Sequence, residues 1–250
     1  MTDRRAAIVL AAGKGKRMKS DLPKVLHRIH GRPIINILMD TLAKLGFDRL
    51  VVVVGFKGEL VQEELADYPV SFVWQKEQLG TGHAVMMTEE LMADFEGTTL
   101  VALGDVPFLS AESIEHLFKT HAETGASATC LSAVVEDASG YGRIIRKGES
   151  SVLQAIVEDK DATAEILKIR EFNTGTFCFD NKLMFETIKL VGNQNAQGEY
   201  YLTDTIKIMH NRGLRVSVVP AVDSDEVEGI NSAEQLERLA SKFVDRFSPR

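Results

Sequence analysis

The sequence predicts an α/β fold with a Rossmann-like, mixed and mainly parallel sheet that is flanked by helices. First, uniformly apolar runs of strand length occur at residues 6–10, 49–54 and 99–103, as in strands covered on both faces. Second, segments with helical periodicity alternate with these runs, which is the pattern of βαβ units. Third, strand-like runs continue beyond Gly140 without a Pro/Ser/Gly-rich linker, so we expect both halves to share one sheet.

Each element of the first half follows from its apolar periodicity and its end signals. Pro33 suits the first position of a helix whose apolar residues recur from Ile34 to Leu45, and Gly46 can end it. Ser110 is placed to cap a helix. The predicted helices here are 34–45, 58–66, 85–91 and 111–123, and the predicted strands are 6–10, 49–54, 70–74, 99–103 and 128–135.

The second half is richer in strands than the first half. Ser232 and Gln235 form a capping box, which predicts a helix running towards Phe247. The sequence therefore divides into a domain over 1–231 and a C-terminal helix within 232–250. The other predicted elements are strands at 142–146, 152–157, 172–179 and 215–219 and a helix at 201–210.

Composition narrows the classes of function. The chain has 250 residues, 44% of them hydrophobic and 26% charged, which is typical of a soluble globular protein. A formal net charge of −7 disfavours nucleic acid as a partner. No run approaches the roughly 20 apolar residues of a membrane span, and the first apolar run is too short for a signal peptide. Cys130 and Cys178 form no motif, so we expect a cytoplasmic protein with no membrane partner.

A glycine-containing basic loop follows the first predicted strand. Gly13 and Gly15 permit a sharp turn, and residues 14–32 carry seven Lys or Arg and one acid, Asp21. Backbone N–H groups and cations together suit a polyphosphate. An ordinary βα turn with a solvated basic loop is the alternative. The dinucleotide fingerprint fails at Met18, and no Gly-Lys-Ser/Thr triplet of a P-loop occurs here.

Two further strand ends carry polar groups. Gln75, Gln78 and Thr81 leave the strand at 70–74, where open α/β sheets bind ligands, and they could read a nucleobase edge or form a polar connector. Asp105 follows the strand at 99–103 and could hold Mg²⁺ against phosphates or cap the next turn.

Three residues of the second half could match a sugar. Glu158 and Asn173 supply an acceptor and a donor, and the backbone N–H of Gly142 supplies another donor. From the residues alone, both side chains could equally be surface groups. Asn231 is, on the same terms, only the residue before a helix cap. His27 and His30 lack a third ligand, so we do not expect zinc.

The opening motif, Leu-x-x-Gly-x-Gly-x-Arg-Met followed by Pro-Lys at 10–24, resembles the signature of the sugar-phosphate nucleotidyltransferases. The strings at 75–84, 140–143, 157–162, 171–175 and 195–204 are similar to those of the N-acetylglucosamine-1-phosphate uridylyltransferases. The resemblance implies the nucleotide-diphospho-sugar transferase fold. It also implies transfer of a uridylyl group from UTP to N-acetyl-α-D-glucosamine 1-phosphate, by in-line attack and without a covalent intermediate.

The resemblance also implies residue roles. Arg17 and Lys24 are the catalytic cations, and Asp105 and Asn231 are the ligands of a Mg²⁺ cofactor. An aromatic residue is usual in the family where this chain has Leu103, so we expect one weaker nucleoside contact. The expected substrate-binding residues are Leu10, Ala11, Ala12, Gly13, Gly15, Gln75, Gly80, Thr81, Leu103, Gly104, Gly142, Glu158, Asn173 and Asn231.

Other functions stay open at this point. The family's bifunctional members continue into a left-handed β-helix that carries acetyl transfer and trimerisation. This sequence has no such repeats, so we expect no acetyltransferase activity and a monomer or weak oligomer. A nucleotidyltransferase for another base or sugar phosphate, such as a cytidylyltransferase of isoprenoid synthesis or a molybdopterin guanylyltransferase, is one alternative. A non-catalytic nucleotide-sugar sensor is the other.

Overall fold

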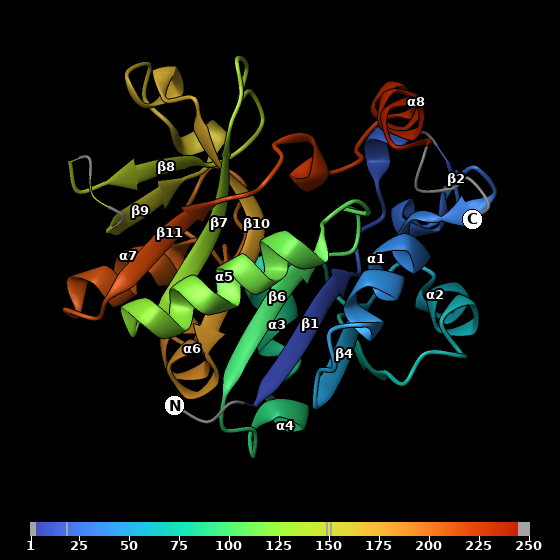
Figure 1. The fold of residues 1–250 in the computed structure, drawn as a ribbon, viewed down its shortest axis with the longest axis horizontal. Helices are drawn as coiled ribbons and strands as arrows, with labels where there is room; N and C mark the ends of the chain where they lie inside the picture. Colours follow the sequence, from blue (N-terminus) through green and yellow to red (C-terminus); the bar gives the residue numbers. More distant parts are fainter. Residues whose placement is uncertain (1–3, 19, 149, 151, 245–250) are drawn as a thin grey trace.

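One nine-stranded sheet organises the molecule (Figure 1). The computed structural model describes residues 4–18, 20–148, 150 and 152–244. Seven strands follow the order β11-β7-β10-β6-β1-β4-β5, and β8 joins β10 to β9. Among the described residues, the antiparallel strand pairs of this sheet are β10 with β6, β7 and β8, and β8 with β9. The strands are β1 (Arg5–Ala11), β4 (Arg49–Val54), β5 (Ser71–Trp74), β6 (Thr98–Leu103), β7 (Ala128–Val134), β8 (Arg143–Arg146), β9 (Leu153–Val157), β10 (Glu171–Asp180) and β11 (Val216–Pro220).

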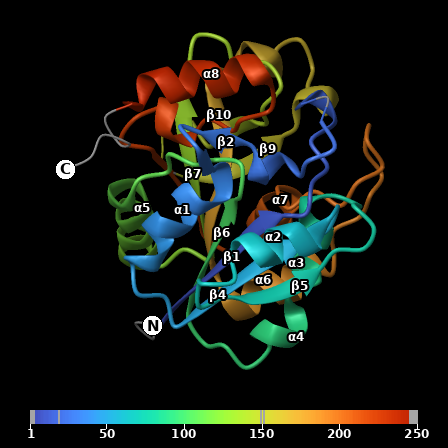
Figure 2. The same cartoon turned by 90° about the vertical axis from the view of Figure 1, so that its right-hand side faces the viewer.

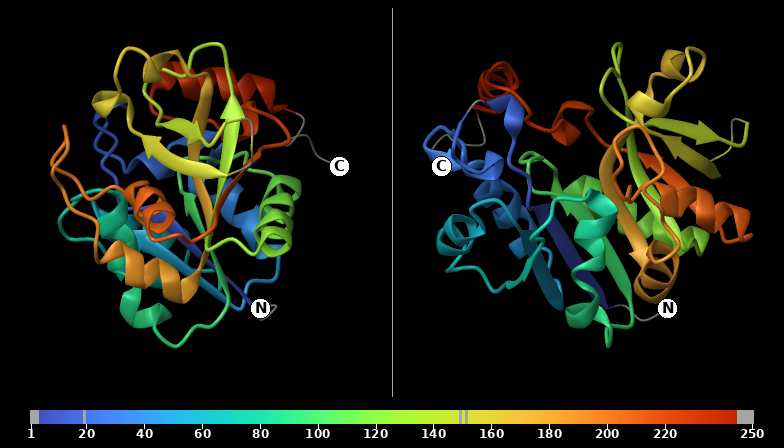
Figure 3. Two further views of the ribbon diagram at one scale, coloured as in Figure 1. Left: turned by 90° about the vertical axis from the view of Figure 1, so that its left-hand side faces the viewer. Right: turned by 180° about the vertical axis from the view of Figure 1, so that it is seen from behind.

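Helices cover both faces of this sheet. Figures 1 and 3 show α1 and α5 on one face, and Figure 3 shows α3, α6 and α7 on the other. The first group comprises α1 (Ile34–Ala43), α2 (Gly58–Glu64) and α5 (Ala111–Thr124). The second comprises α3 (Thr81–Met86), α4 (Glu89–Met92), α6 (Asn181–Ile188) and α7 (Asp204–Asn211). The predicted α/β class, with a mixed and mostly parallel sheet, is confirmed.

Alternation along the strands builds two separate cores. Successive strand side chains point to opposite faces of a sheet. In β1, Ala7 and Val9 therefore pack with α1, α2 and α5, whereas Ala6 and Ile8 pack with α3, α4, α6 and α7. Because both faces are buried, the strands have to be apolar throughout, which explains the uniform runs in the sequence.

A third, smaller core joins residues 29–37 to the C-terminal helix. It lies between the hairpin β2 (Arg28–Ile29) and β3 (Arg32–Pro33), helix α1 and helix α8 (Ala233–Lys242). The rings of Phe108 and Phe243 stack there with centroids 4.1 Å apart. Figure 2 shows α8 lying across this end of the molecule, next to β2. The buried residues of this core are Ile29, Ile34, Ile37, Phe108, Ile230 and Leu239.

Several helices differ from the predictions. The helix expected at 85–91 begins earlier, at Thr81, and is interrupted around Thr88, whose hydroxyl donates to the carbonyl of Val85 at 2.7 Å. Helix α6, capped by Asp180, was not predicted. Helix α7 begins at Asp204 rather than 201. Helix α8 ends at Lys242 with Phe243 as its C-cap, and residues 245–247 of its predicted length lie outside the described residues.

Two further observations bear on the sequence predictions. Cys130 and Cys178 are both free and buried in the sheet, and burial raises the pKa of each thiol. Within the part of the chain that the structure describes, no helix has the length and apolar character needed to cross a membrane.

Asn181 is the buried polar node that ties α6 to the sheet. Its amide accepts from the Thr99 hydroxyl at 2.9 Å and donates to the carbonyls of Met92 and Phe95 at 3.0 and 2.8 Å. Asn181→Ala leaves these groups unpaired inside the protein and lowers the free energy of unfolding by about 3 kcal/mol. Urea denaturation measures the loss, with the exposed Asn193→Ala as control. Equal midpoints for the two variants would contradict this account.

Candidate active site

A cavity of about 430 Å³ opens at the carboxyl ends of β1, β5 and β6. The ends of parallel strands meet at one edge of a sheet, and open α/β folds bind ligands there. The second half of the chain closes the other side through β10 and the loops at 140–142 and 199–203. The cavity is lined by these expected residues: Leu10, Ala11, Ala12, Gly13, Arg17, Lys24, Gln75, Gly80, Thr81, Leu103, Asp105, Gly142, Glu158, Asn173 and Asn231.

The glycine loop brings Lys24 to the cavity. Gly15 has φ +69°, and a Cβ there would lie 2.6 Å from the Cβ of Lys24, so only glycine allows the two segments to approach. A 3-10 turn over Lys24–Leu26 then directs the lysine inward. Gly15 and Gly104 do not themselves line the cavity. Gly104 lies behind it, and its N–H donates to the carbonyl of Leu10 at 2.9 Å.

Four polar side chains from distant parts of the chain meet at one point. The ammonium of Lys24 forms an ion pair with Asp105 and donates to Oδ1 of Asn231 at 3.1 Å. Arg17 lies at the exposed rim of the cavity and donates to the same Oδ1, with a donor–acceptor distance of 2.8 Å. Asp105 is only 9% exposed, so its negative charge acts on Lys24 in a partly desolvated setting.

The same four groups test whether a divalent cation would fit. One carboxylate and one amide oxygen both face the positive charge of Lys24, so this point already accommodates a cation. Mg²⁺ prefers oxygen ligands and commonly takes one or two carboxylates besides waters and substrate phosphates. No group of three His, Cys, Asp or Glu able to hold a metal occurs among the described residues. A cation bound by Asp105 and Asn231 would therefore take its other ligands from substrate and water.

Gln75 lies on the cavity wall with its amide orientation fixed. The side chain is 3% exposed, and its Nε2 donates to the carbonyl of Gly80 at 2.9 Å and contacts Nδ1 of His83 at 3.1 Å. Both N–H groups are thereby engaged within the protein. The carbonyl oxygen Oε1 remains as the group that can recognise a donor on a ligand.

The glycines at 80 and 82 allow two loops to touch. A Cβ at Gly80 would lie 2.6 Å from the carbonyl oxygen of Tyr200, and the N–H of Gly82 donates to that oxygen at 2.7 Å. Thr81 accepts the N–H of Leu202 at 3.1 Å. The main chain at 200–202 thus braces the loop from the first half.

The three residues expected to meet a sugar lie together. Asn173 N donates to the carbonyl of Gly142 at 2.8 Å, and a Cβ on Gly142 would contact the Glu158 carboxylate at 3.4 Å. Glu158 accepts from the hydroxyl of Thr203 at 2.8 Å. Burial raises the pKa of the Glu158 carboxyl, and the hydrogen bond from Thr203 opposes this rise.

A bulge in β10 shapes the cavity floor. The register of β10 against β7 shifts between Asn173 and Phe177, and Gly175 there has φ +78°. Leu103 packs directly on this glycine, because a Cβ at Gly175 would lie 2.4 Å from its Cδ1. The leucine therefore fills the floor beneath the bulge, and its expected effect on a nucleoside contact stays a prediction.

Sequence reasoning missed several lining residues. Tyr141 stacks obliquely on Phe172 with centroids 4.5 Å apart. Burial, together with the charges of Glu228 and Asp105, raises the pKa of Tyr141 to about 12, so its hydroxyl stays a donor. Thr203 and Phe177 also line the cavity. Thr203 lies within the string at 195–204, but that string does not mark it as a lining residue, and no motif marks Phe177. Their places depend on long-range packing that only the fold defines.

The sequence pattern of the MobA-like NTP transferase domain matches residues 7–171, which include most of the cavity wall. The chain belongs to this family. It is also 48% identical over 244 residues to proteins named bifunctional protein GlmU from Bacillus cereus and Bacillus anthracis. These matches cover 98% of the chain and 53% of each relative, so the chain spans about half the length of the curated relatives.

Solved structures support the fold of this MobA-like NTP transferase domain. A UDP-glucose pyrophosphorylase complexed with UDP-glucose superposes with a TM-score of 0.75 at 18% identity, covering 97% of this chain and 99% of that one. HddC from Yersinia pseudotuberculosis, complexed with GMP-PN, gives a TM-score of 0.69 at 17% identity, covering 95% and 99%. The expected nucleotide-sugar transferase fold is confirmed.

Glu158 makes the stability of the site depend on pH. The pKa of Glu158 is raised in the folded protein, so the protonated carboxyl stabilises the folded state. This stabilisation is fully present below the pKa of the unfolded state and is lost as pH rises through the pKa of the folded state. Glu158→Gln keeps the acceptor for Thr203 and removes the buried charge. We expect this variant to unfold at a higher temperature than the unsubstituted protein at about pH 8, and at the same temperature at about pH 4.

Differential scanning fluorimetry at both pH values measures this difference, with the exposed Glu136→Gln as a matched control. A gain that appears only at the lower pH would show that the sign of the argument is wrong.

Proposed function

We propose that this protein transfers the uridylyl group of UTP to N-acetyl-α-D-glucosamine 1-phosphate, giving UDP-N-acetylglucosamine and pyrophosphate. The observation that carries the proposal is the meeting of Arg17, Lys24, Asp105 and Asn231 between a glycine loop and the residues suited to a sugar. The similarity to GlmU proteins supports the same assignment. Two buried free thiols fit a reducing compartment, so we propose the cytoplasm as its location.

The environment of Gln75 supports uracil as the base. Since both of its N–H groups are used on Gly80 and His83, the side chain presents an acceptor to the cavity. Uracil carries an N–H at ring position 3, whereas cytosine has a bare acceptor there. Cytosine would leave two acceptors facing each other, which costs the desolvation of both groups. Thr81 and Gly80 at the mouth of the same loop would contact the nucleoside.

Glu158, Asn173 and Gly142 support a sugar with an acetamido group. The Glu158 carboxylate can accept hydrogen bonds from sugar hydroxyls. The NH₂ group of Asn173 and the N–H of Gly142 can donate to the carbonyl oxygen of the acetamido group. Asn173 Oδ1 is engaged by the N–H of Gly175 at 2.9 Å, which fixes the amide so that its NH₂ group faces away from that bond. Thr203 in turn holds Glu158.

The reaction we propose is a single in-line displacement. A phosphate oxygen of the sugar phosphate attacks the α-phosphorus of UTP, and the bond to the β-phosphate oxygen breaks as pyrophosphate leaves. Lys24 and Arg17 neutralise the negative charge on the phosphates, and the backbone at Ala12 and Gly13 positions them. Asp105 and Asn231 would hold Mg²⁺, which would supply Lewis-acid neutralisation of the phosphate charge when bound. No side chain near the four-residue cluster needs to act as a nucleophile in this scheme.

Pyrophosphate release tests this function. The reaction mixtures contain Mg²⁺ with UTP, CTP or GTP and with N-acetylglucosamine 1-phosphate or glucose 1-phosphate. We expect release that requires Mg²⁺ and is confined to UTP with the acetamido sugar. Release with another pair would overturn the reading of Gln75 or of the sugar residues. UTP binding without release in any mixture would favour the sensor instead.

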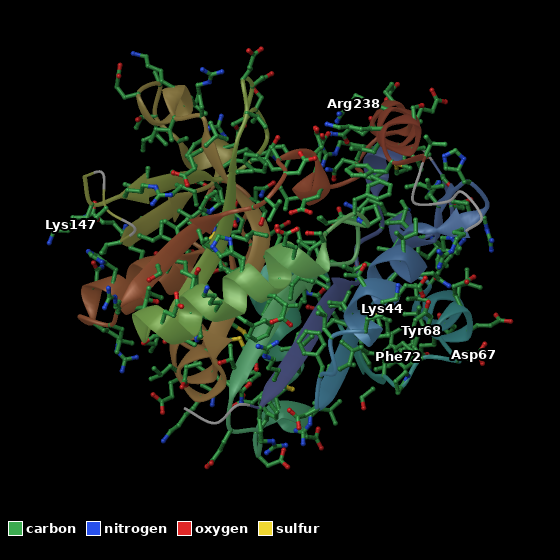
Figure 4. All side chains as sticks on the ribbon, in the orientation of Figure 1. Lys44, Asp67, Tyr68, Phe72, Lys147 and Arg238 are labelled. Carbon is green, nitrogen blue, oxygen red and sulfur yellow. The ribbon has the colours of Figure 1, made fainter. Side chains whose placement is uncertain are left out.

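Lys24 is the side chain whose loss should cost most. Lys24→Ala removes the ammonium nearest the two candidate metal ligands. We expect kcat/KM to fall about a hundredfold, which corresponds to a loss of transition-state stabilisation on the order of 3 kcal/mol. The control is Lys44→Ala, which removes an exposed lysine after α1 (Figure 4). Near-normal turnover of the Lys24 variant would rule out its assigned role.

A further inference from the structure

We propose that Gln235 of α8 is a positioning residue that fixes Asn231 for cation binding. This inference rests on the proposed function, because it assumes that Asn231 serves as a ligand. Gln235 lies outside the cavity, and neither the opening motif nor the sugar strings include it. The sequence marks it only as the second member of a capping box.

The capping box is shifted by one residue in the structure. Ser232 caps α8 by accepting the N–H of Gln235 at 3.2 Å. In the usual box the second side chain returns to the N–H of the cap residue itself. Here Oε1 of Gln235 instead accepts the N–H of Asn231 at 2.8 Å. The residue pair that caps the helix therefore also holds the main chain of Asn231, the candidate metal ligand.

The side chain of Asn231 depends on that backbone position. Its Nδ2 donates to the carbonyl of Gly229, two residues away, at 3.1 Å, so this bond moves together with the segment. Its Oδ1 faces Lys24 and Arg17, whose charged groups stand at the ends of long side chains. The bond to Gln235 ties the main chain of Asn231 to helix α8. Outer-sphere groups of this kind orient metal ligands in many proteins.

Helix α8 is itself held by packing and ion pairs, so its attachment to Asn231 can fix the position of that residue. Leu239 is fully buried in the third core together with Ile230, the residue before Asn231. The N–H of Ile230 donates to the carbonyl of Asp105 at 2.9 Å, which ties the two candidate ligands together. Ion pairs of Arg238 with Glu228 and of Lys242 with Asp225 join the helix to the segment that precedes Asn231. Figure 4 shows Arg238 at this end of the molecule.

Two substitutions separate positioning from simple stability. Both substitutions remove the 3.4 Å bond from Gln235 Nε2 to Glu228. Gln235→Met also removes the acceptor, whereas Gln235→Glu keeps an acceptor oxygen for the Asn231 N–H. The control is Glu237→Met, on the exposed face of the same helix. All three variants are compared by thermal unfolding, by Mn²⁺ binding without substrates using electron paramagnetic resonance, and by the Mg²⁺ dependence of pyrophosphate release.

We expect Gln235→Met to weaken Mn²⁺ binding about tenfold and to raise the Mg²⁺ concentration for half-maximal rate by a similar factor. The maximal rate at saturating Mg²⁺ should change much less. Gln235→Glu should retain Mn²⁺ affinity close to that of the unsubstituted protein, and Glu237→Met should match it.

The inference is overturned if Gln235→Met binds Mn²⁺ as well as Glu237→Met does. It is equally overturned if the Met and Glu variants lose affinity together in proportion to a lower unfolding temperature, because that describes a structural role. The Mn²⁺ measurement requires no turnover. A protein that shows the expected Mn²⁺ pattern but releases no pyrophosphate would therefore refute the proposed function and leave the role of Gln235 standing.

Discussion

The site depends on one partly buried charge cluster in which Lys24 bridges Asp105 and Asn231. These residues are separated by up to 207 positions in the chain, yet their polar atoms meet at one point. Burying a carboxylate and an ammonium is costly unless each satisfies the other. The cluster is therefore stable only if the loop with Lys24, the end of β6 and the segment before α8 are all correctly placed. The fold can be understood as the scaffold that meets this requirement.

The sheet supplies most of that placement. Parallel strands β1 and β6 pair in register from Arg5 with Thr98 to Leu10 with Leu103, so their carboxyl ends present the glycine loop and Asp105 side by side. Antiparallel β10 then brings its first residues to the same edge, which places Asn173 opposite the nucleotide loops. The third core locks the hairpin after Lys24 against α8. Each half of the site is thus rigid before a ligand arrives, and such preorganisation favours catalysis by positioning.

The parts of this arrangement that sequence predicted are those with local causes. Buried strands are apolar in sequence because both faces are covered, and Gly15 and Gly80 mark turns that admit no Cβ. The opening motif marked Arg17 and Lys24 after the first strand, and Asp105 was marked by its place just after the strand at 99–103. Helix α6 was not predicted because its cap, Asp180, is also the last residue of β10, so no turn separates the strand from the helix. Tyr141 and Thr203 lie within the strings at 140–143 and 195–204, but neither string marks them as lining residues, and Gln235 was predicted as part of a helix cap without its bond to Asn231. Their roles arise from contacts across the fold.

We propose that Asp105 and Asn231 share one cation position that Lys24 borders. The most direct measurement is the anomalous scattering of Mn²⁺ in crystals grown with UTP. We expect a peak within coordination distance of the Asp105 carboxylate and Asn231 Oδ1, with the Lys24 ammonium turned from these oxygens towards the phosphates. Mn²⁺ bound to the nucleotide alone, with Lys24 still bridging both oxygens, would contradict the account.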